Sequence, residues 1–199
     1  MQFNKEQTFW NNFMNDKKLK KFSDWVGDSE AESKVFFYNY IKNKNFKSIL
    51  DMGCGNATIS AGLKKNNIDM KYVGVDSCKY FVKNGIKNNL EIIESDIRKV
   101  DLNDSSFDLV FGRHVVEHQP NFKDLFNEMI RIGKKECIHI FFIKPVRITN
   151  INYDSSLDLY HNQYSIIDIK KFLDNHPKIR SYKVIDINSK ENMLIMELK

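Results

Sequence analysis

Two histidines and a glutamate, His114, Glu117 and His118, lie within five positions of one another. Imidazole titrates near neutral pH and is the usual side chain for removing a proton, and a carboxylate can orient it. The three residues follow the run 107–113, which predicts a strand, so they should lie just beyond a strand end. We interpret them as candidate acid–base groups. The alternative is that Glu117 and His118 only support the loop by hydrogen bonds.

The same segment matches the H-x-x-E-H pattern of inverted zinc proteases. That chemistry needs both histidines on one face of a helix and a distant third ligand, for which Glu191 would be the nominal candidate. Gln119-Pro120 ends a helix at once, and Glu191 falls in a predicted hairpin. We therefore predict no metal site and keep a zinc hydrolase as a minor alternative.

A second candidate site is the run Asp51-Met-Gly53-Cys-Gly55, where a predicted strand enters a glycine turn and then a helix. Glycines allow close approach of a ligand to the backbone, and a helix N-terminus offers N–H groups to an anion. Asp51 would repel a pyrophosphate but attract an ammonium group. The pattern favours an amino-acid moiety, such as the methionine end of S-adenosylmethionine.

Asp76 and Asp96 follow the next two predicted strands. A carboxylate in the place of Asp76 can accept from both hydroxyls of a ribose, and Asp96 can accept from an adenine amine. Each acid taken alone is equally typical of a helix cap, and Gly-x-Gly of a tight turn. The glycine turn and the three acids together, at the ends of successive strands, favour an adenosine carrying an amino acid as the ligand.

Alternating apolar runs and helical stretches predict an α/β fold with a mainly parallel sheet. The last two strands are too close for a crossover helix and should form an antiparallel hairpin at the sheet edge. The expected strands are 47–51, 70–76, 90–94, 107–113, 136–143, 179–187 and 193–198, and the expected helices are 57–67, 78–88, 122–132 and one capped by Ser165. Two further helices, 4–22 and 28–43, precede them.

Composition limits the other possibilities. The chain has 199 residues and a net charge of +5, and we expect one domain, with a helical cap at 1–44 and a catalytic core at 45–199. The longest apolar run, 137–143, is too short to span a membrane, and no secretory signal is visible. Cys54, Cys78 and Cys137 suit reduced thiols, which predicts a cytoplasmic location.

The stretches SILDMGCGNA, YVGVD, ESDI and FDLVFGRHVVEHQP together resemble the motifs of class I S-adenosylmethionine-dependent methyltransferases, close to the type 11 group. The resemblance implies a Rossmann-like, seven-stranded sheet with its last strand antiparallel, and S-adenosylmethionine as cofactor. It departs from the family at Ala57, where a third glycine is common. The cofactor-binding residues expected on this basis are Asp51, Gly53, Gly55, Asp76, Ser77, Asp96, Ile97 and Arg113.

Within such a fold, Arg113 and His114 should lie over the cofactor, and residues one helical turn on should project towards the acceptor. His118 is therefore the better candidate for the base. Some quinone-pathway O-methyltransferases are similar here and need a divalent metal, but His114 replaces their first acid. The unpatterned insert 144–164 should overhang the site, with Arg147, Tyr160 and Tyr164 as candidate substrate contacts; the alternative is a surface loop in which Tyr164 staples the following helix.

The sequence thus predicts a methyltransferase acting on a small molecule or a glycan, with oxygen as the favoured acceptor atom. Nucleic acid is an unlikely acceptor, because no Asn-Pro-Pro-Tyr-type run follows the fourth strand and no RNA-binding module fits in the length. The second class is a non-catalytic cofactor-binding protein on the same fold.

Overall fold

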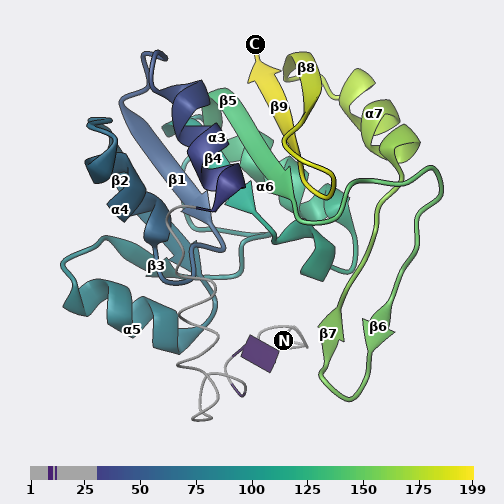
Figure 1. The fold of residues 1–199 in the computed structure, drawn as a ribbon, viewed down its shortest axis with the longest axis horizontal. Helices are drawn as coiled ribbons and strands as arrows, with labels where there is room; N and C mark the ends of the chain where they lie inside the picture. The colour runs from purple at the N-terminus through teal and green to yellow at the C-terminus, as the bar shows by residue number, and fades with distance from the viewer. Residues whose placement is uncertain (1–8, 11, 13–30) are drawn as a thin grey trace.

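A computed structural model describes residues 9, 10, 12 and 31–199, and these build one seven-stranded sheet flanked by helices on both faces (Figure 1). The strand order is β3-β2-β1-β4-β5-β9-β8. Strands β1 to β5 are all parallel to one another, and β9 runs antiparallel to both of its neighbours, β5 and β8. The strands are β1 (Ser48–Met52), β2 (Lys71–Asp76), β3 (Ile92–Glu94), β4 (Phe107–Arg113), β5 (Gly133–Phe141), β8 (Ile179–Asp186) and β9 (Asn192–Leu198).

The predicted fold class is confirmed, because the alternating apolar runs become strands buried on both faces. In β1, Ile49 belongs to the core that includes residues of the helices at Glu32–Ile41 and Thr58–Lys65, while Leu50 and Met52 belong to a second core that includes residues of the helix at Phe122–Ile132. Such two-sided burial is the reason parallel strands read as nearly continuous apolar runs. The helices are α3 (Glu32–Ile41), α4 (Thr58–Lys65), α5 (Lys79–Lys87), α6 (Phe122–Ile132) and α7 (Ile166–Asp174), with a 3₁₀ turn η1 (Val116–His118).

Two helix caps follow the sequence as expected. Ser165 Oγ accepts from the backbone N–H of Asp168 at the start of α7, and Asn121 Oδ1 accepts from that of Asp124 at the start of α6. Each side chain satisfies a donor that has no partner inside the helix. None of the helices within the described residues combines the length and apolarity that a bilayer crossing needs.

Two expectations need correction. The 144–164 insert is an arm with its own short hairpin, β6 (Tyr153–Asp154) and β7 (Leu159–Tyr160), which projects from the body in Figure 1. β5 begins at Gly133, directly where α6 ends, and not at residue 136. On α3 the buried face includes Ser33, Lys34 and Phe37, whereas Val35 is exposed.

The predicted helix at 4–22 and the start of the one at 28–43 lie largely outside the described residues. Among the seven strands, β8 and not β9 forms the edge. β9 is inserted between β5 and β8, so the turn that precedes it adjoins the carboxyl end of β5, where Asn192 pairs with Phe141. This placement brings the residues before β9 to the end of the sheet where a ligand binds in such folds.

Candidate functional site

The glycine turn after β1 needs its glycines for two different reasons. Gly53 has φ of 74° and Gly55 has φ of 50°, a left-handed conformation that residues with a Cβ rarely adopt. A Cβ on Gly53 would also lie 2.3 Å from Val115 Cγ1, whereas a Cβ on Gly55 would meet nothing within 4 Å. Gly53 therefore allows the turn to pack against the segment after β4, and Gly55 lines open space.

Asp51 is buried at the end of β1, with 3% of its surface exposed. Its Oδ2 accepts a hydrogen bond of 2.8 Å from the Tyr72 hydroxyl. Burial raises the pKa of Asp51 to about 7, against the lowering effects of Tyr72, Lys34 and Arg113. Lys34 is itself buried and donates from Nζ to Thr58 Oγ1 at the start of α4, at 2.6 Å. Asp51 at the end of β1 and Lys34 of α3 thus supply a buried acid beside the glycine turn and a buried cation at the start of α4.

Asp76 closes β2 and braces the same turn. Its Oδ2 accepts from the Gly55 amide and its Oδ1 from the Cys78 amide, both at 2.8 Å. Burial raises the pKa of Asp76, although these amides and that of Ser77 lower it. Each oxygen keeps a further lone pair, so the carboxylate can still accept from ribose hydroxyls.

Asp96 follows β3 and is held by its neighbour Arg98. The guanidinium donates from Nη2 to Oδ2 at 2.7 Å, and the Arg98 amide donates to Oδ1 at 2.9 Å. Partial burial raises the pKa of Asp96, but the Arg98 guanidinium and amide outweigh this and hold the pKa below its ordinary value. Ile97 beside it is nearly buried. The structure therefore adds to the predicted acid a cation that the adenine-side interpretation did not include.

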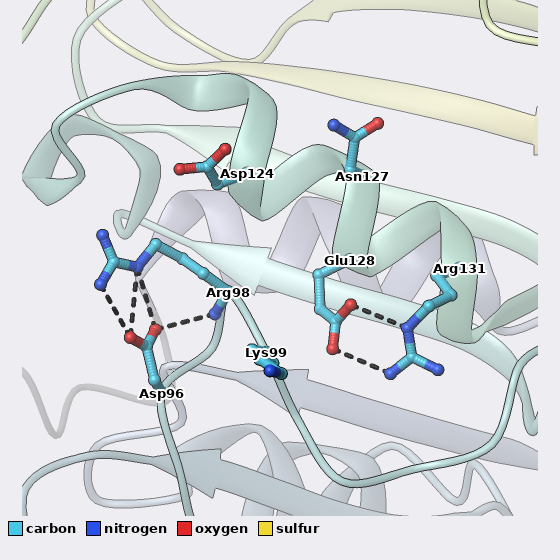
Figure 2. A pocket seen from close by; sticks show the side chains of 7 residues that line it. All are labelled: Asp96, Arg98, Lys99, Asp124, Asn127, Glu128 and Arg131. Atoms are coloured by element: carbon cyan, nitrogen blue, oxygen red, sulfur yellow. Dashed lines mark hydrogen bonds and ion pairs between the residues drawn. The ribbon is translucent and has the colours of Figure 1, made fainter. Parts of the chain in front are cut away.

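A shallow groove lies beside Asp96, between this turn and α6 (Figure 2). Four of its charged residues form ion pairs within its own walls, since Arg98 binds Asp96 and Arg131 binds Glu128. No residue of the glycine turn or of the 113–118 segment lines it. We therefore do not assign the groove to either substrate. It is lined by Asp96, Arg98, Lys99, Asp124, Asn127, Glu128 and Arg131.

Arg113 ends β4 and His114 follows it, and both side chains meet a residue far along the chain. His114 Nε2 lies 2.6 Å from Glu191 Oε1, and Arg113 Nη2 lies 3.6 Å from the same oxygen. Arg113 Nε also donates to Ser33 Oγ on α3, at 3.0 Å. Burial lowers the pKa of His114, so its imidazole is neutral at neutral pH.

His118 lies at the end of η1 among aromatic rings. Its Nδ1 is 2.7 Å from the backbone oxygen of Tyr160, which can only accept, so Nδ1 carries the hydrogen and Nε2 the lone pair. Its ring stacks on Phe142 at 5.7 Å and meets His161 and Trp10 edge-on. Burial lowers the pKa of His118. It is a neutral imidazole with one nitrogen available for a proton.

Glu117 does not occupy the predicted place on the acceptor side. It is 1% exposed, its Oε1 accepts from the Phe142 amide at 2.8 Å, and its Oε2 lies 3.9 Å from Nε2 of the buried His139. Burial opposes ionisation, but His139 holds the pKa of Glu117 below its ordinary value. The imidazole that Glu117 faces is thus His139 of β5, and its hydrogen bond to the Phe142 amide links the 113–118 segment to the end of β5.

The arm contributes one of its three predicted contacts to this place. The Tyr160 backbone binds His118, as described above. Tyr164 is buried, with its hydroxyl donated to the backbone oxygen of Gln119 and its ring against Phe122, which is a packing role. Arg147 is exposed at the base of the arm. Asn162 also joins the arm to this segment, since its backbone N–H donates to the Glu117 backbone oxygen at 2.8 Å.

The zinc-protease geometry is not formed. His114 has φ of 59°, so it precedes η1 in a left-handed conformation and cannot share a helix face with His118. No group of three or more histidine, cysteine or acidic side chains with the arrangement of a metal site occurs within residues 31–199 and the three described residues before them.

An adenosine carrying an amino acid fits the residues at the ends of β1 and β2. Gly55 leaves the turn open, Asp51 and Lys34 supply opposite charges for an ammonium and a carboxylate, and Asp76 keeps acceptor capacity. Sequence reasoning missed Lys34 and Tyr72, and it considered Glu191 only as a nominal third zinc ligand. Tyr72 was visible only as a residue of the second predicted strand, where it pairs with Ile49, and nothing in the local sequence marks Lys34.

Comparison with known proteins places residues 50–141 in a family described as a methyltransferase domain. The chain is 26% identical over 115 residues to the sterol 24-C-methyltransferase ERG6A of Gibberella zeae, covering 52% of this chain and 29% of that protein. It is 26% identical over 172 residues to the ribosomal RNA small subunit methyltransferase C of Buchnera aphidicola, covering 81% and 48%. The chain thus spans less than half the length of these curated relatives.

Among solved structures, the fold is similar to magnesium protoporphyrin IX methyltransferase from Synechocystis PCC 6803 with bound SAH. The TM-score is 0.67 at 14% identity, over 98% of this chain and all of that one. At this level of identity the likeness shows the fold alone.

Proposed function

Because this chain belongs to the class I S-adenosylmethionine-dependent methyltransferases of the type 11 group, we propose that it methylates a small molecule or a glycan at an oxygen atom. The family explains why an acid at Asp51 precedes a glycine turn. The nature of the acceptor and the acceptor atom are the parts of the proposal that go beyond the family.

The observation that carries the proposal is the buried acid Asp51 at the glycine turn, on which the charge of the buried Lys34 acts. Asp51 has a pKa of about 7, so it ionises readily once a cation lies against it, and Lys34 offers a cation at the start of α4. A zwitterionic amino acid matches this pair, with its ammonium towards Asp51 and its carboxylate towards Lys34 and the helix N-terminus. A dinucleotide pyrophosphate does not match Asp51.

The remaining cofactor contacts follow from the strand ends. Asp76, with Ser77 beside it, would hold the ribose hydroxyls, and Asp96 and Ile97 would lie against the adenine. Arg113 would neutralise charge near the methionine end. When bound, S-adenosylmethionine supplies an electrophilic methyl group on a sulfonium sulfur. The chain must therefore align an acceptor and remove its proton.

Two imidazoles are suited to take that proton. His114 and His118 both contact the ring of Phe142, at 5.7 Å, from different positions after β4. Both are neutral at neutral pH, since burial lowers the pKa of each. An oxygen acceptor gains most from such a base, because an un-ionised hydroxyl is a poor nucleophile.

A small acceptor is supported by the way the arm closes over this place. The Tyr160 oxygen, His161 and Phe142 surround His118. A rigid aromatic surrounding suits a compact molecule with an apolar ring or a sugar face. Arg147 and Tyr160 of the arm are the proposed substrate contacts. We further propose a single domain, 1–44 capping 45–199, located in the cytoplasm, which the three unbridged cysteines suit.

The test begins with calorimetric titration of S-adenosylhomocysteine and of NAD into the protein. We expect S-adenosylhomocysteine to bind at micromolar concentration and NAD not to bind. Binding of NAD as tight as that of S-adenosylhomocysteine contradicts the proposal.

The second step incubates the protein with methyl-labelled S-adenosylmethionine and separate pools of metabolites, oligosaccharides, RNA and proteins. Label transferred to an oxygen of a small molecule or glycan supports the proposal. Label in the RNA pool instead would overturn the acceptor class while leaving the family intact, and it is included because one curated relative is named for ribosomal RNA.

A further inference from the structure

Glu191, in the turn before β9, forms the closest side-chain contact of His114. Its Oε1 lies 2.6 Å from His114 Nε2, and its Oε2 accepts from Asn188 Nδ2 at 3.0 Å. Arg113 approaches the same Oε1 at 3.6 Å. The carboxylate is thus held from two sides and presented to one nitrogen of the imidazole.

This contact fixes which nitrogen of His114 carries the hydrogen. Burial raises the pKa of Glu191, but the hydrogen bonds from His114, Asn188 and Ser33 outweigh this and hold the pKa at about 2. The carboxylate is therefore ionised and can only accept hydrogen bonds. His114 must therefore donate from Nε2. In the neutral ring Nδ1 then holds the lone pair, which is the opposite tautomer from His118.

The backbone also holds His114 in an unusual conformation. Its φ of 59° is unfavourable for a residue with a large side chain, and its amide donates to the Ile140 oxygen at 2.9 Å. The next residue, Val115, fills the space where a side chain on Gly53 would stand. Strain of this kind persists where neighbouring structure enforces it, and it is concentrated at functional sites.

We propose that Glu191 is a positioning residue that makes Nδ1 of His114, and not Nε2 of His118, the atom that takes the acceptor's proton. The inference rests on the proposed function. The acceptor O–H bond breaks and its proton passes to Nδ1, while the oxygen takes the methyl group from the sulfonium sulfur, leaving S-adenosylhomocysteine and a protonated imidazole.

The reason for preferring His114 is the charge that the base acquires. An imidazolium at His114 is formed against the Glu191 carboxylate, which stabilises it in the way that an aspartate stabilises the histidine of a hydrolase triad. At His118 the hydrogen-bond partner is a neutral carbonyl, and no carboxylate among the described residues is hydrogen-bonded to its ring. The charged groups that act on His114 are Glu191, Arg113 and Glu117.

Imidazole nitrogen spectra of histidine-labelled protein test the tautomers without any acceptor. With S-adenosylhomocysteine present, and with signals assigned by single His→Gln variants, we expect His114 to be protonated at Nε2 and His118 at Nδ1. In Glu191→Gln the pKa of His114 should fall by about one unit, because an opposite charge is lost, and that of His118 should stay. A His114 protonated at Nδ1, or unmoved by Glu191→Gln, overturns the proposal.

Two further variants keep this result interpretable. Glu136→Gln removes a similarly buried carboxylate at the other end of β5, where it binds Tyr40 and Lys44, and should leave both histidines unchanged. Should Glu191→Gln fold poorly, Glu191→Asp retains the charge and should keep the Nε2–H tautomer. Loss of that tautomer in Glu191→Asp, in a folded protein, counts against a charge-based role.

Kinetics with the acceptor found by label transfer then separate the two imidazoles. We expect Glu191→Gln to lower kcat tenfold or more and to move the acidic limb of the pH–rate profile to lower pH, with S-adenosylhomocysteine affinity unchanged. His114→Gln should lower kcat by about 10²- to 10⁴-fold. A larger loss in His118→Gln than in His114→Gln refutes the choice of base, whereas failure to bind S-adenosylhomocysteine refutes the proposed function instead.

Discussion

The two halves of the ligand end of the sheet differ in where their polar side chains find partners. At the β1–β3 end, defined by Asp51, Asp76 and Asp96, the hydrogen-bond partners lie nearer in sequence: Arg98 is two positions from Asp96, and the partners Tyr72 and Gly55 lie 21 positions from Asp51 and Asp76. At the β4–β9 end, defined by His114, Glu117 and His118, they are distant. His114 meets Glu191, 77 positions on, and His118 meets the Tyr160 backbone, 42 positions on.

The difference teaches that the two ends are specified in different ways. A glycine turn and an acid at a strand end carry their geometry in a few consecutive residues. An imidazole acquires its tautomer and its charge partner only when the arm and the β8–β9 hairpin have docked. Gly53 is where the two ends touch, because Val115 fills the space beside it.

The largest effect is expected from Gly53→Ala, which forces the two ends apart. The methyl group would lie 2.3 Å from Val115 Cγ1 on a residue with φ of 74°. Left-handed strain and overpacking together should lower the free energy of unfolding by about 2–5 kcal/mol. Urea denaturation measures this. Gly55→Ala is the matched control, with φ of 50° but open space, and should cost only about 1 kcal/mol. Equal costs would show that contact between the ends is unimportant.

Glu117→Gln tests whether the β4–β9 end depends on its buried anchor. The change removes the charge beside His139 while keeping an acceptor for the Phe142 amide. We expect the free energy of unfolding to fall by about 1–3 kcal/mol. Combining it with His139→Leu should cost less than the sum of the two single changes, because the leucine leaves no imidazole to pair. Strict additivity in denaturation experiments would contradict the pairing.

Asp51→Asn tests the β1–β3 end by separating stability from binding. Asparagine can still accept from Tyr72 but cannot attract an ammonium group, so S-adenosylhomocysteine affinity should fall about tenfold to hundredfold by calorimetry. The wild-type affinity should also decline as pH drops below about 7, where Asp51 takes up a proton, and the variant should lose this dependence.

Asp51→Asn should weaken ligand binding without lowering the stability of the fold. Because the pKa of Asp51 is raised to about 7, the native protein holds a proton there that the unfolded chain releases at lower pH. This group therefore lowers stability as pH rises from its ordinary pKa through about 7. Asp51→Asn should be at least as stable as the wild type at pH 8, in thermal unfolding. A marked loss of stability there would mean that the charge is structural.

The smallest effect is expected from Arg98→Ala. Its pair with Asp96 is partly exposed and local, so the free energy of unfolding should change by less than about 1 kcal/mol. Without the guanidinium beside Asp96, the affinity for S-adenosylhomocysteine should change by no more than a few-fold. A change as large as that of Asp51→Asn would show that Arg98 itself contacts the ligand.

Much of the fold was predictable because the pattern is local. The strand at Phe107–Arg113 and the helix at Phe122–Ile132 were predicted with the bounds that the structure shows, since a buried strand and an amphipathic helix leave different periodicities. The insert 144–164 was not, because its hairpin strands are only two residues long and leave no periodic signal. The cap at Ser165 was likewise visible, since it depends on a single residue.

The sequence by itself determined the order of strands and helices, the glycine turn and the acids that follow three strands, since each depends on neighbouring residues. Only the tertiary structure decided that Glu117 turns inwards to His139, that Lys34 lies buried beside Asp51, and that Glu191 reaches His114. The physical reason lies in the sheet: β9 is inserted between β5 and β8, and that insertion carries Glu191 from a presumed edge to the ligand end. No local pattern encodes a contact between residues 77 positions apart.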